Sequence, residues 1–244
     1  MQDWYRDLFG PDYLRMDWHD TTLQEVDSLG RMVTLRRGTK VLDLCCGYGR
    51  HAIPLAAKGC RVTGLDLSEA LLSKAQADAR EQGAAVDWVR ADARRLPLRG
   101  GFDVVLNLFT AFGYFEREGE NLQVLQEAAR VLAPGGHFVL DVVNHDFLVR
   151  YFEEQNWYDR GDSLVLEERS FDHQESRVYG SWTLVEADGT RRVYPNSIRA
   201  YTFAELRLLL TLVGLDVVQV YGGYDRQPLS WESPRMVILS RKGA

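Results

Sequence analysis

The sequence contains few cysteines and no long apolar run. Its three cysteines, Cys45, Cys46 and Cys60, are odd in number and form no CxxC spacing. This pattern disfavours a disulfide framework and a metal site, so we expect reduced thiols and no bound metal. No apolar stretch approaches the roughly 20 residues that a membrane-spanning helix needs. Segment 1–12 is polar and aromatic, unlike a signal peptide, so we expect a cytoplasmic protein.

Positive charge is also in short supply. The 29 basic residues are outnumbered by 35 acidic ones, which gives a formal net charge of −6. An acidic surface repels phosphate backbones and therefore disfavours a nucleic-acid partner. The sequence shows no internal repeat or low-complexity run, and its composition is that of a globular domain. We therefore expect a small-molecule partner, whereas the oligomeric state stays open.

Short apolar segments alternate with amphipathic ones through residue 143. Predicted strands cover 41–44, 61–65, 86–90, 102–108 and 137–143, and predicted helices cover 50–58, 69–82 and 121–132. Ser68 is a good N-cap for the second helix, and Pro134-Gly135-Gly136 predicts a sharp turn. Continuously apolar strands between helices indicate a parallel sheet that is covered on both faces. This region predicts a doubly wound α/β domain.

The rhythm changes after residue 144. Alternating patterns at 163–171, 177–186 and 190–200, with a turn at Asp188-Gly189, predict antiparallel strands. Thr202 then caps a helix that ends near 213, and strands at 215–221 and 236–240 predict a hairpin at one sheet edge. We therefore divide the chain into an N-terminal helical cap (1–37), a seven-stranded, mostly parallel α/β core (38–144 and 200–244) and a small antiparallel β insertion (145–199).

A glycine-bearing turn follows the first predicted strand. The strand runs into Cys45-Cys46-Gly47-Tyr48-Gly49, and a helix opens directly afterwards. Glycines at such a turn let backbone amides approach a nucleotide closely. Asp66 ends the next strand, at the distance where an acid accepts hydrogen bonds from ribose hydroxyls. The two features together indicate a nucleoside-binding site.

The first turn also bears on which nucleotide is bound. Ala52 is tolerated where a dinucleotide fingerprint has its third glycine. However, Asp43 lies in the strand end ahead of the glycines, where a carboxylate disfavours a pyrophosphate. The position suits a ligand with an ammonium group and no phosphate. An NAD-dependent oxidoreductase therefore remains the less favoured alternative.

Four motifs in order resemble the class I S-adenosylmethionine-dependent methyltransferases of small-molecule type. They are Val41–Gly49, Thr63–Ser68, Ala91–Ala93 and Leu132–Leu140, which resemble respectively the glycine-rich loop, the ribose-binding strand end, the adenine-binding element and the turn before the fifth strand. The resemblance implies a Rossmann-like fold and S-adenosylmethionine as the cofactor. One departure is Cys45, where many members have glycine.

The resemblance also implies roles for individual residues. Asp66 would bind the ribose hydroxyls, and Asp92 would accept from the adenine amino group. The other cofactor-binding residues that it implies are Asp43, Cys45, Gly47 and Gly49 at the first loop and methionine part, Leu67 and Ala93 beside the adenine, and Asn107 and Phe109 near the reactive sulfur.

Methyl transfer is an in-line displacement in which the protein supplies alignment and desolvation. A base is needed only where the acceptor must lose a proton. His145 and Tyr114, at the ends of predicted strands, are the catalytic candidates, and His51 and His19 are further histidines that could face the cleft. We expect methyl transfer to O or N of a small molecule. A non-catalytic cofactor-binding or interaction protein is the other alternative.

The acceptor site should be built from the parts added to the sheet. These are the N-terminal helices, segment 110–115, the loop around Tyr224 and the insertion, which we interpret as a substrate lid. Their aromatic residues could line an apolar pocket or hold an amine by cation–π contacts. They are Trp4, Tyr5, Tyr13, Phe112, Tyr114, Trp157, Trp182, Tyr201 and Tyr224.

Overall fold

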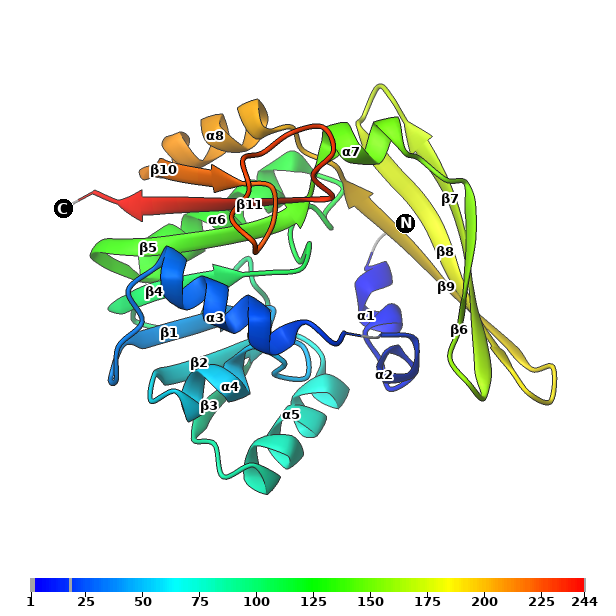
Figure 1. Cartoon of the computed structure of the whole chain (residues 1–244), viewed down its shortest axis with the longest axis horizontal. Helices are drawn as coiled ribbons and strands as arrows, with labels where there is room; N and C mark the ends of the chain where they lie inside the picture. Colours follow the sequence, from blue (N-terminus) through cyan, green and yellow to red (C-terminus); the bar gives the residue numbers. More distant parts are fainter. Residues whose placement is uncertain (1–2, 18, 244) are drawn as a thin grey trace.

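A seven-stranded sheet forms the core of the chain (Figure 1). The computed structural model describes residues 3–17 and 19–243; residues 1, 2, 18 and 244, which the expected cap and core include, lie outside this description. The strand order is β10-β11-β5-β4-β1-β2-β3, and only β11 runs antiparallel to its neighbours. The strands are β1 (Lys40–Leu44), β2 (Arg61–Asp66), β3 (Val86–Arg90), β4 (Phe102–Asn107), β5 (Leu132–Val143), β10 (Leu215–Tyr221) and β11 (Arg235–Lys242). The predicted doubly wound fold is confirmed.

Helices cover both faces of this sheet, which is why its central strands are continuously apolar. One face packs on α6 (Glu118–Val131) and α8 (Phe203–Leu212), and the other on α3 (Thr22–Met32) and α4 (Ala52–Ala57). The remaining core helix, α5 (Glu69–Glu81), packs beside β2 and β3. Both predicted caps are confirmed: Ser68 accepts from Leu71 N–H, and Thr202 forms a capping box with Glu205.

The Pro134-Gly135-Gly136 turn lies inside β5 instead of before it. Phe102 pairs with Leu132 and Val104 with His137, so four residues of β5 face one residue of β4. Gly135 has a φ of 73°, which lets the chain fold out of register there without ending the ladder. The strand is therefore longer than its apolar run predicts.

A second, four-stranded antiparallel sheet lies beside the core. It consists of β6 (Gln155–Asp159), β7 (Ser163–Asp172), β8 (Arg177–Glu186) and β9 (Arg191–Arg199), and the short helix α7 (His145–Arg150) leads into it. The last three strands confirm the predicted antiparallel segments. The sequence analysis missed α7 and β6, because α7 buries none of its residues and β6 is almost wholly exposed, so neither shows an apolar pattern.

The helices α1 (Trp4–Leu8) and α2 (Tyr13–Met16) lie between the second sheet and the core (Figure 1). Their apolar side chains form a small separate core with the facing side of that sheet. Its buried members are Trp4, Tyr5, Leu8, Met16, Val165 and Leu184. The N-terminal region is thus held against the core by the insertion.

Ion pairs reinforce this contact at the far end of the second sheet. Asp12 accepts from Arg192 Nε at 2.6 Å and from the Tyr194 hydroxyl. Arg15 binds both carboxylate oxygens of Glu186, and Arg192 binds the same carboxylate. These side chains are partly exposed, so each pair alone contributes little. As a network they fix the position of α2 on β8 and β9.

A buried arginine connects the second sheet to the loop after β4. Arg177 is 3% exposed and donates to Ser197 Oγ at 3.0 Å and to the Phe115 carbonyl at 2.6 Å. Its Nη1 also lies 3.5 Å from the carbonyl of Gly113, which accepts from Arg199 N–H at 2.8 Å. The second sheet therefore determines the path of segment 113–115.

We expect Arg177→Met to lower the free energy of unfolding by about 2–4 kcal/mol, because it removes the hydrogen bonds that this buried guanidinium group donates to Ser197 Oγ and to the Phe115 carbonyl. Arg192→Met removes only partly exposed contacts and should leave the free energy of unfolding nearly unchanged. Urea titrations of both variants, followed by circular dichroism, measure the difference. Equal and small effects would show that Arg177 does not hold the loop.

Candidate functional site

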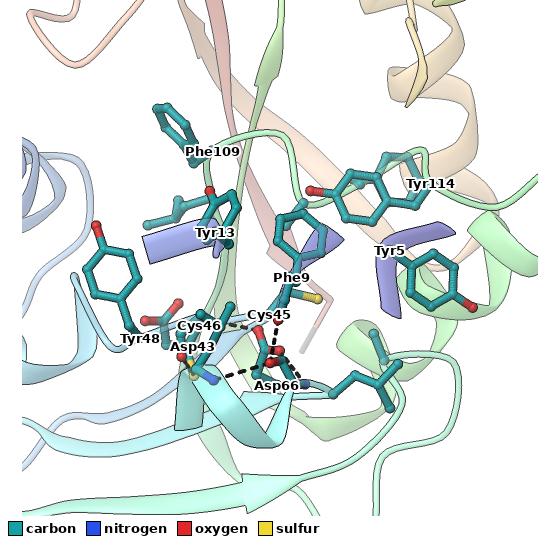
Figure 2. A pocket seen from close by; sticks show the side chains of 18 of the residues that line it. Tyr5, Phe9, Tyr13, Asp43, Cys45, Cys46, Tyr48, Asp66, Phe109 and Tyr114 are labelled. Atoms are coloured by element: carbon teal, nitrogen blue, oxygen red, sulfur yellow. Dashed lines mark hydrogen bonds between the residues drawn. The ribbon is translucent and has the colours of Figure 1, made fainter. Parts of the chain in front are cut away.

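A cavity of about 330 Å³ lies at the carboxyl ends of β1, β2, β3 and β4 (Figure 2). Ligands of open α/β sheets bind at this edge. The N-terminal segment forms the opposite wall through Tyr5, Phe9, Tyr13, Asp17 and His19. None of the described residues of the insertion, 145–199, lines the cavity.

The two glycines of the glycine-rich loop have different roles: Gly47 faces the cavity, and Gly49 packs behind the loop. Gly47 has a φ of 56° and lines the cavity, and an added Cβ there would meet only the Leu71 side chain, at 3.9 Å. Gly49 lies behind the loop, where an added Cβ would come within 2.6 Å of the Trp88 ring. Cys45 lines the cavity and has a φ of 63°, a conformation that favours glycine. The departure from the family pattern therefore occurs at a position where backbone strain is present.

Asp66 holds this loop in place. Its Oδ2 accepts from Gly47 N–H and its Oδ1 from Ser68 N–H, each at 2.8 Å. Burial raises the pKa of this carboxyl, whereas the backbone donors lower it. Each oxygen keeps further acceptor capacity toward the cavity. The geometry fits a carboxylate that also receives ribose hydroxyls.

Asp43 is the most unusual group of the site. It is 2% exposed, and its Oδ2 has no hydrogen-bond partner within residues 3–17 and 19–243. Burial raises its pKa to about 6, although the nearby His51 and Arg50 act in the opposite direction. An unpartnered buried carboxylate oxygen in a cavity wall fits a ligand that brings its own positive charge.

The end of the cavity at β3 carries the residues predicted for adenine. Asp92, Ala93 and Leu67 all line it. Arg94 binds the Asp92 carboxylate through Nε at 3.0 Å and Nη2 at 2.6 Å. Burial would raise the pKa of Asp92, but Arg94 brings it below the ordinary value, so Asp92 is an ionised acceptor at neutral pH.

Of the two site residues predicted at the end of β4, one lines the cavity and one does not. Phe109 lines the cavity, whereas Asn107 is fully buried outside it and donates from Nδ2 to the Leu44 carbonyl at 3.1 Å. Phe109 and Thr110 have φ values of 58° and 60°. Asp141 of β5 stabilises this left-handed turn by accepting from Phe109 N–H at 2.9 Å. Sequence analysis missed Asp141, although a lone acid in an apolar strand was a usable signal.

Of the two catalytic candidates, Tyr114 lines the cavity and His145 does not. Tyr114 lines the cavity, and burial raises its pKa far above the ordinary value, so its hydroxyl stays protonated. His145 lies outside the cavity, with Nδ1 3.0 Å from Asp146 and its ring against Phe171. Tyr114 can therefore donate a hydrogen bond in the cavity, and His145 does not reach it.

His51 and His19 both line the cavity, each beside a carboxylate. His51 Nε2 lies 2.7 Å from Glu25 Oε2. His19 Nε2 lies 2.7 Å from Asp17 Oδ1, but the two atoms are not aligned as a hydrogen bond. Burial would raise the pKa of Asp17, but His19 and the neighbouring Tyr48 bring it below its ordinary value. Asp17 is thus a second ionised carboxylate, on the wall opposite Asp66.

Aromatic rings fill much of the remaining wall. Phe9 lies 4.9 Å from Tyr13 and 5.7 Å from Tyr114, between ring centroids. Figure 2 shows these rings above the glycine-rich loop, with Tyr48 beside Asp43. Phe9 and Tyr48 were missed by the sequence analysis. Of the expected aromatic residues, the cavity includes Tyr5, Tyr13, Phe112 and Tyr114 and excludes Trp4, Trp157, Trp182, Tyr201 and Tyr224.

Within residues 3–17 and 19–243, no three His, Cys, Asp or Glu side chains are grouped so that they could hold a metal ion. In the same part of the chain, no helix has the length and apolar character needed to cross a membrane.

Comparisons with known proteins agree with this geometry. Residues 41–136 match the family model of a methyltransferase domain. The cypemycin N-terminal methyltransferase of Streptomyces sp is 29% identical over 83% of this chain and 82% of its own length. A ubiquinone biosynthesis O-methyltransferase of Pseudomonas aeruginosa is 34% identical, over 45% of this chain and about half (46%) of its own length.

The fold has a close counterpart among solved structures. A S-adenosylmethionine-dependent methyltransferase from Clostridium acetobutylicum superposes with a TM-score of 0.82, covering 96% of both chains at 20% identity. The matched domain contains the glycine-rich loop, Asp66 and Asp92, which line one cavity. Residues 41–136 therefore form a methyltransferase domain, the chain has the fold of the S-adenosylmethionine-dependent methyltransferases, and S-adenosylmethionine is its cofactor.

Proposed function

We propose that this protein transfers a methyl group from S-adenosylmethionine to a nitrogen or oxygen atom of a small molecule. The observation that carries the proposal is the convergence of Asp43, Asp66 and Asp92, from three neighbouring strands, on one cavity closed by an aromatic wall. The similar proteins include an N-terminal methyltransferase and an O-methyltransferase, which supports both acceptor atoms. The assignment of the cap, core and insertion as separate functional parts belongs to the same proposal.

The chain contributes binding, alignment and exclusion of water. When bound, the cofactor supplies an activated methyl group on a sulfonium. Asp66 orients the ribose, and Asp92 receives the adenine amino group. The rings of Phe9, Tyr13 and Phe109 exclude water from the place where the acceptor attacks. Tyr114, which keeps its proton, would donate a hydrogen bond to a polar group of the acceptor beside the attacking atom.

The charge of the wall favours a nitrogen acceptor. Five lining carboxylates, of Asp17, Asp43, Asp66, Glu69 and Asp92, face three guanidinium groups, of Arg6, Arg50 and Arg90. Such a cavity disfavours an anionic acceptor. Asp17, beside the rings of Tyr13 and Tyr48, provides the carboxylate and aromatic faces that recognise an ammonium group. His19, next to Asp17, is placed to take the proton that the amine loses.

Incubation with labelled S-adenosylmethionine and two acceptor pools, small amines and small phenols or alcohols, tests this function. We expect label in the amine pool, because the cavity wall carries an ionised carboxylate among aromatic rings. Product analysis by mass spectrometry identifies the methylated atom. Label only in the hydroxyl pool would contradict the nitrogen assignment, and no transfer to either pool would favour the non-catalytic alternative.

Asp66→Asn should weaken S-adenosylhomocysteine binding at least tenfold, because a charge-assisted hydrogen bond contributes about 1.5–3 kcal/mol. Asp87→Asn, an exposed change on β3 away from the cavity, is the matched control. Isothermal titration calorimetry gives both constants, and the same assay with NAD should show weaker binding than S-adenosylhomocysteine. An unchanged constant in folded Asp66→Asn would limit Asp66 to holding the Gly47 loop.

The insertion should act on the acceptor through the N-terminal wall. Deleting 145–199 would uncover Trp4 and Leu8, so point variants are the cleaner test. We expect the double variant Arg15→Met, Arg192→Met to raise the acceptor KM roughly fivefold or more, since a misplaced wall weakens alignment. S-adenosylhomocysteine affinity, measured by calorimetry, should change far less. An equal loss of affinity for S-adenosylhomocysteine would show that the N-terminal wall acts mainly on cofactor binding.

A further inference from the structure

Asp141 is the buried centre of a hydrogen-bond network next to Phe109. Its carboxylate is fully buried, and Oδ2 accepts from Phe109 N–H and from the Tyr224 hydroxyl, each at 2.9 Å. Oδ1 accepts from Arg235 Nε at 2.7 Å. The backbone carbonyl of Asp141 accepts from Thr110 N–H, also at 2.9 Å. One residue of β5 therefore binds both residues of the left-handed turn that follows β4.

The turn itself is conformationally unfavourable. Phe109 and Thr110 have φ values of 58° and 60°, a region that non-glycine residues rarely adopt, and β-branched ones least of all. Such residues persist only where surrounding contacts fix them, and they gather at functional sites. Thr110 Oγ1 supplies further contacts, because it accepts from Val143 N–H at 3.0 Å and from Arg235 Nη2 at 3.2 Å. The paired strands β5 and β11 therefore impose the turn on this loop.

The same contacts determine where the ring of Phe109 lies. The ring lines the cavity and is 38% exposed, so it is not placed there to fill the core. The guanidinium groups of Arg235 and Arg50 lie 4.8 and 5.1 Å from its centroid. The ring of His19 lies 4.1 Å away, edge to face. Phe109 therefore connects the network around Asp141 with the histidine that is placed to take the proton of the acceptor.

Tyr224 belongs to this network although it lies outside the cavity. Burial and the charge of Asp141 raise the pKa of its hydroxyl well above the ordinary value, so Tyr224 remains a hydrogen-bond donor. Its backbone carbonyl accepts from the Ser28 hydroxyl of α3, and its ring packs on the apolar core beneath α3. The core therefore fixes the position of this donor independently of any ligand.

We propose that Tyr224 and Arg235 are positioning residues for methyl transfer. They act through Asp141, which fixes the turn and thereby the ring of Phe109. The inference rests on the proposed function, because it presupposes that the acceptor attacks beside this ring. Loss of either donor lets the left-handed backbone relax, and the displaced ring no longer excludes water or aligns the acceptor. The carboxylates assigned to the ribose and the adenine lie on other strands, so cofactor affinity should not depend on this network.

Tyr224→Phe removes one hydroxyl and keeps the aromatic ring. We expect the maximal rate of label transfer from S-adenosylmethionine, to the acceptor pool that the wild-type protein labels, to fall about three- to tenfold because alignment is lost. The KM for S-adenosylmethionine and the calorimetric affinity for S-adenosylhomocysteine should each stay within about twofold. Tyr179→Phe is the matched control, because it removes a hydroxyl that donates to Glu175 on the second sheet, and it should change none of these quantities.

A double-mutant cycle separates positioning from a purely structural role. If Tyr224 acts through Phe109, Tyr224→Phe should slow transfer less than about twofold further in a Phe109→Leu background, since the ring is already lost. Arg235→Met should slow transfer at least as much as Tyr224→Phe, and Arg235→Lys, which keeps the charge, should recover part of the rate. Circular dichroism establishes folding first, and where Arg235→Met does not fold, the Tyr224 cycle decides.

The outcomes of this experiment are distinct. An unchanged rate in folded Tyr224→Phe or Phe109→Leu would overturn the positioning role. Fully additive losses of rate, or a loss of S-adenosylhomocysteine affinity as large as the loss of rate, would overturn it as well. Absence of transfer to either acceptor pool by the wild-type protein would instead overturn the proposed function, and the positioning role with it.

Discussion

Buried carboxylates at the ends of neighbouring parallel strands are the constraint on which the rest of this site depends. A carboxylate out of water is costly unless donors or cations surround it. Asp66 obtains backbone N–H groups from Gly47 and Ser68, and Asp92 obtains a guanidinium group from Arg94. Asp43 has too few donors and cations around it, and its raised pKa reflects this. The shape of the loop and the choice of ligand both follow from how these charges are compensated.

The same principle explains why the opposite wall is polar at one end. Asp17 and Glu25 bring two more carboxylates toward the cavity, and each is matched by a histidine. Toward β3, the wall is built from the rings of Tyr5, Phe9 and Tyr114 instead. A cavity that is aromatic at one end and zwitterionic at the other matches a nucleoside joined to an amino acid.

The sequence predicted the parts of the site that are local in the chain. Asp43, Gly47 and Asp66 lie at or just after the ends of strands with clear apolar runs, so their position at the sheet edge follows from topology. Gly49 is close in sequence to Gly47, and Asn107 to Phe109, but they contact Trp88 and Leu44 behind the cavity. Local spacing cannot distinguish a residue that faces the ligand from one that packs beneath it.

The parts that sequence reasoning missed depend on long-range contacts. Asp17 and Glu25 reach the site because the segment that contains α1–α3 folds back over the sheet, and no periodic pattern predicts where such a segment docks. Phe109 and Thr110 adopt a left-handed turn that Asp141, 32 residues later, stabilises. Interactions between distant residues, rather than propensity, decide these positions.

The two links between the second sheet and the site differ in strength. Arg177 is buried and fixes the backbone of segment 113–115, which supplies Tyr114 to the cavity. Asp12, Arg15 and Arg192 are partly exposed, and solvent weakens their pairing. Arg177 thus determines the path of the loop after β4, whereas these ion pairs add little to a position of α1 and α2 that their buried apolar side chains already determine.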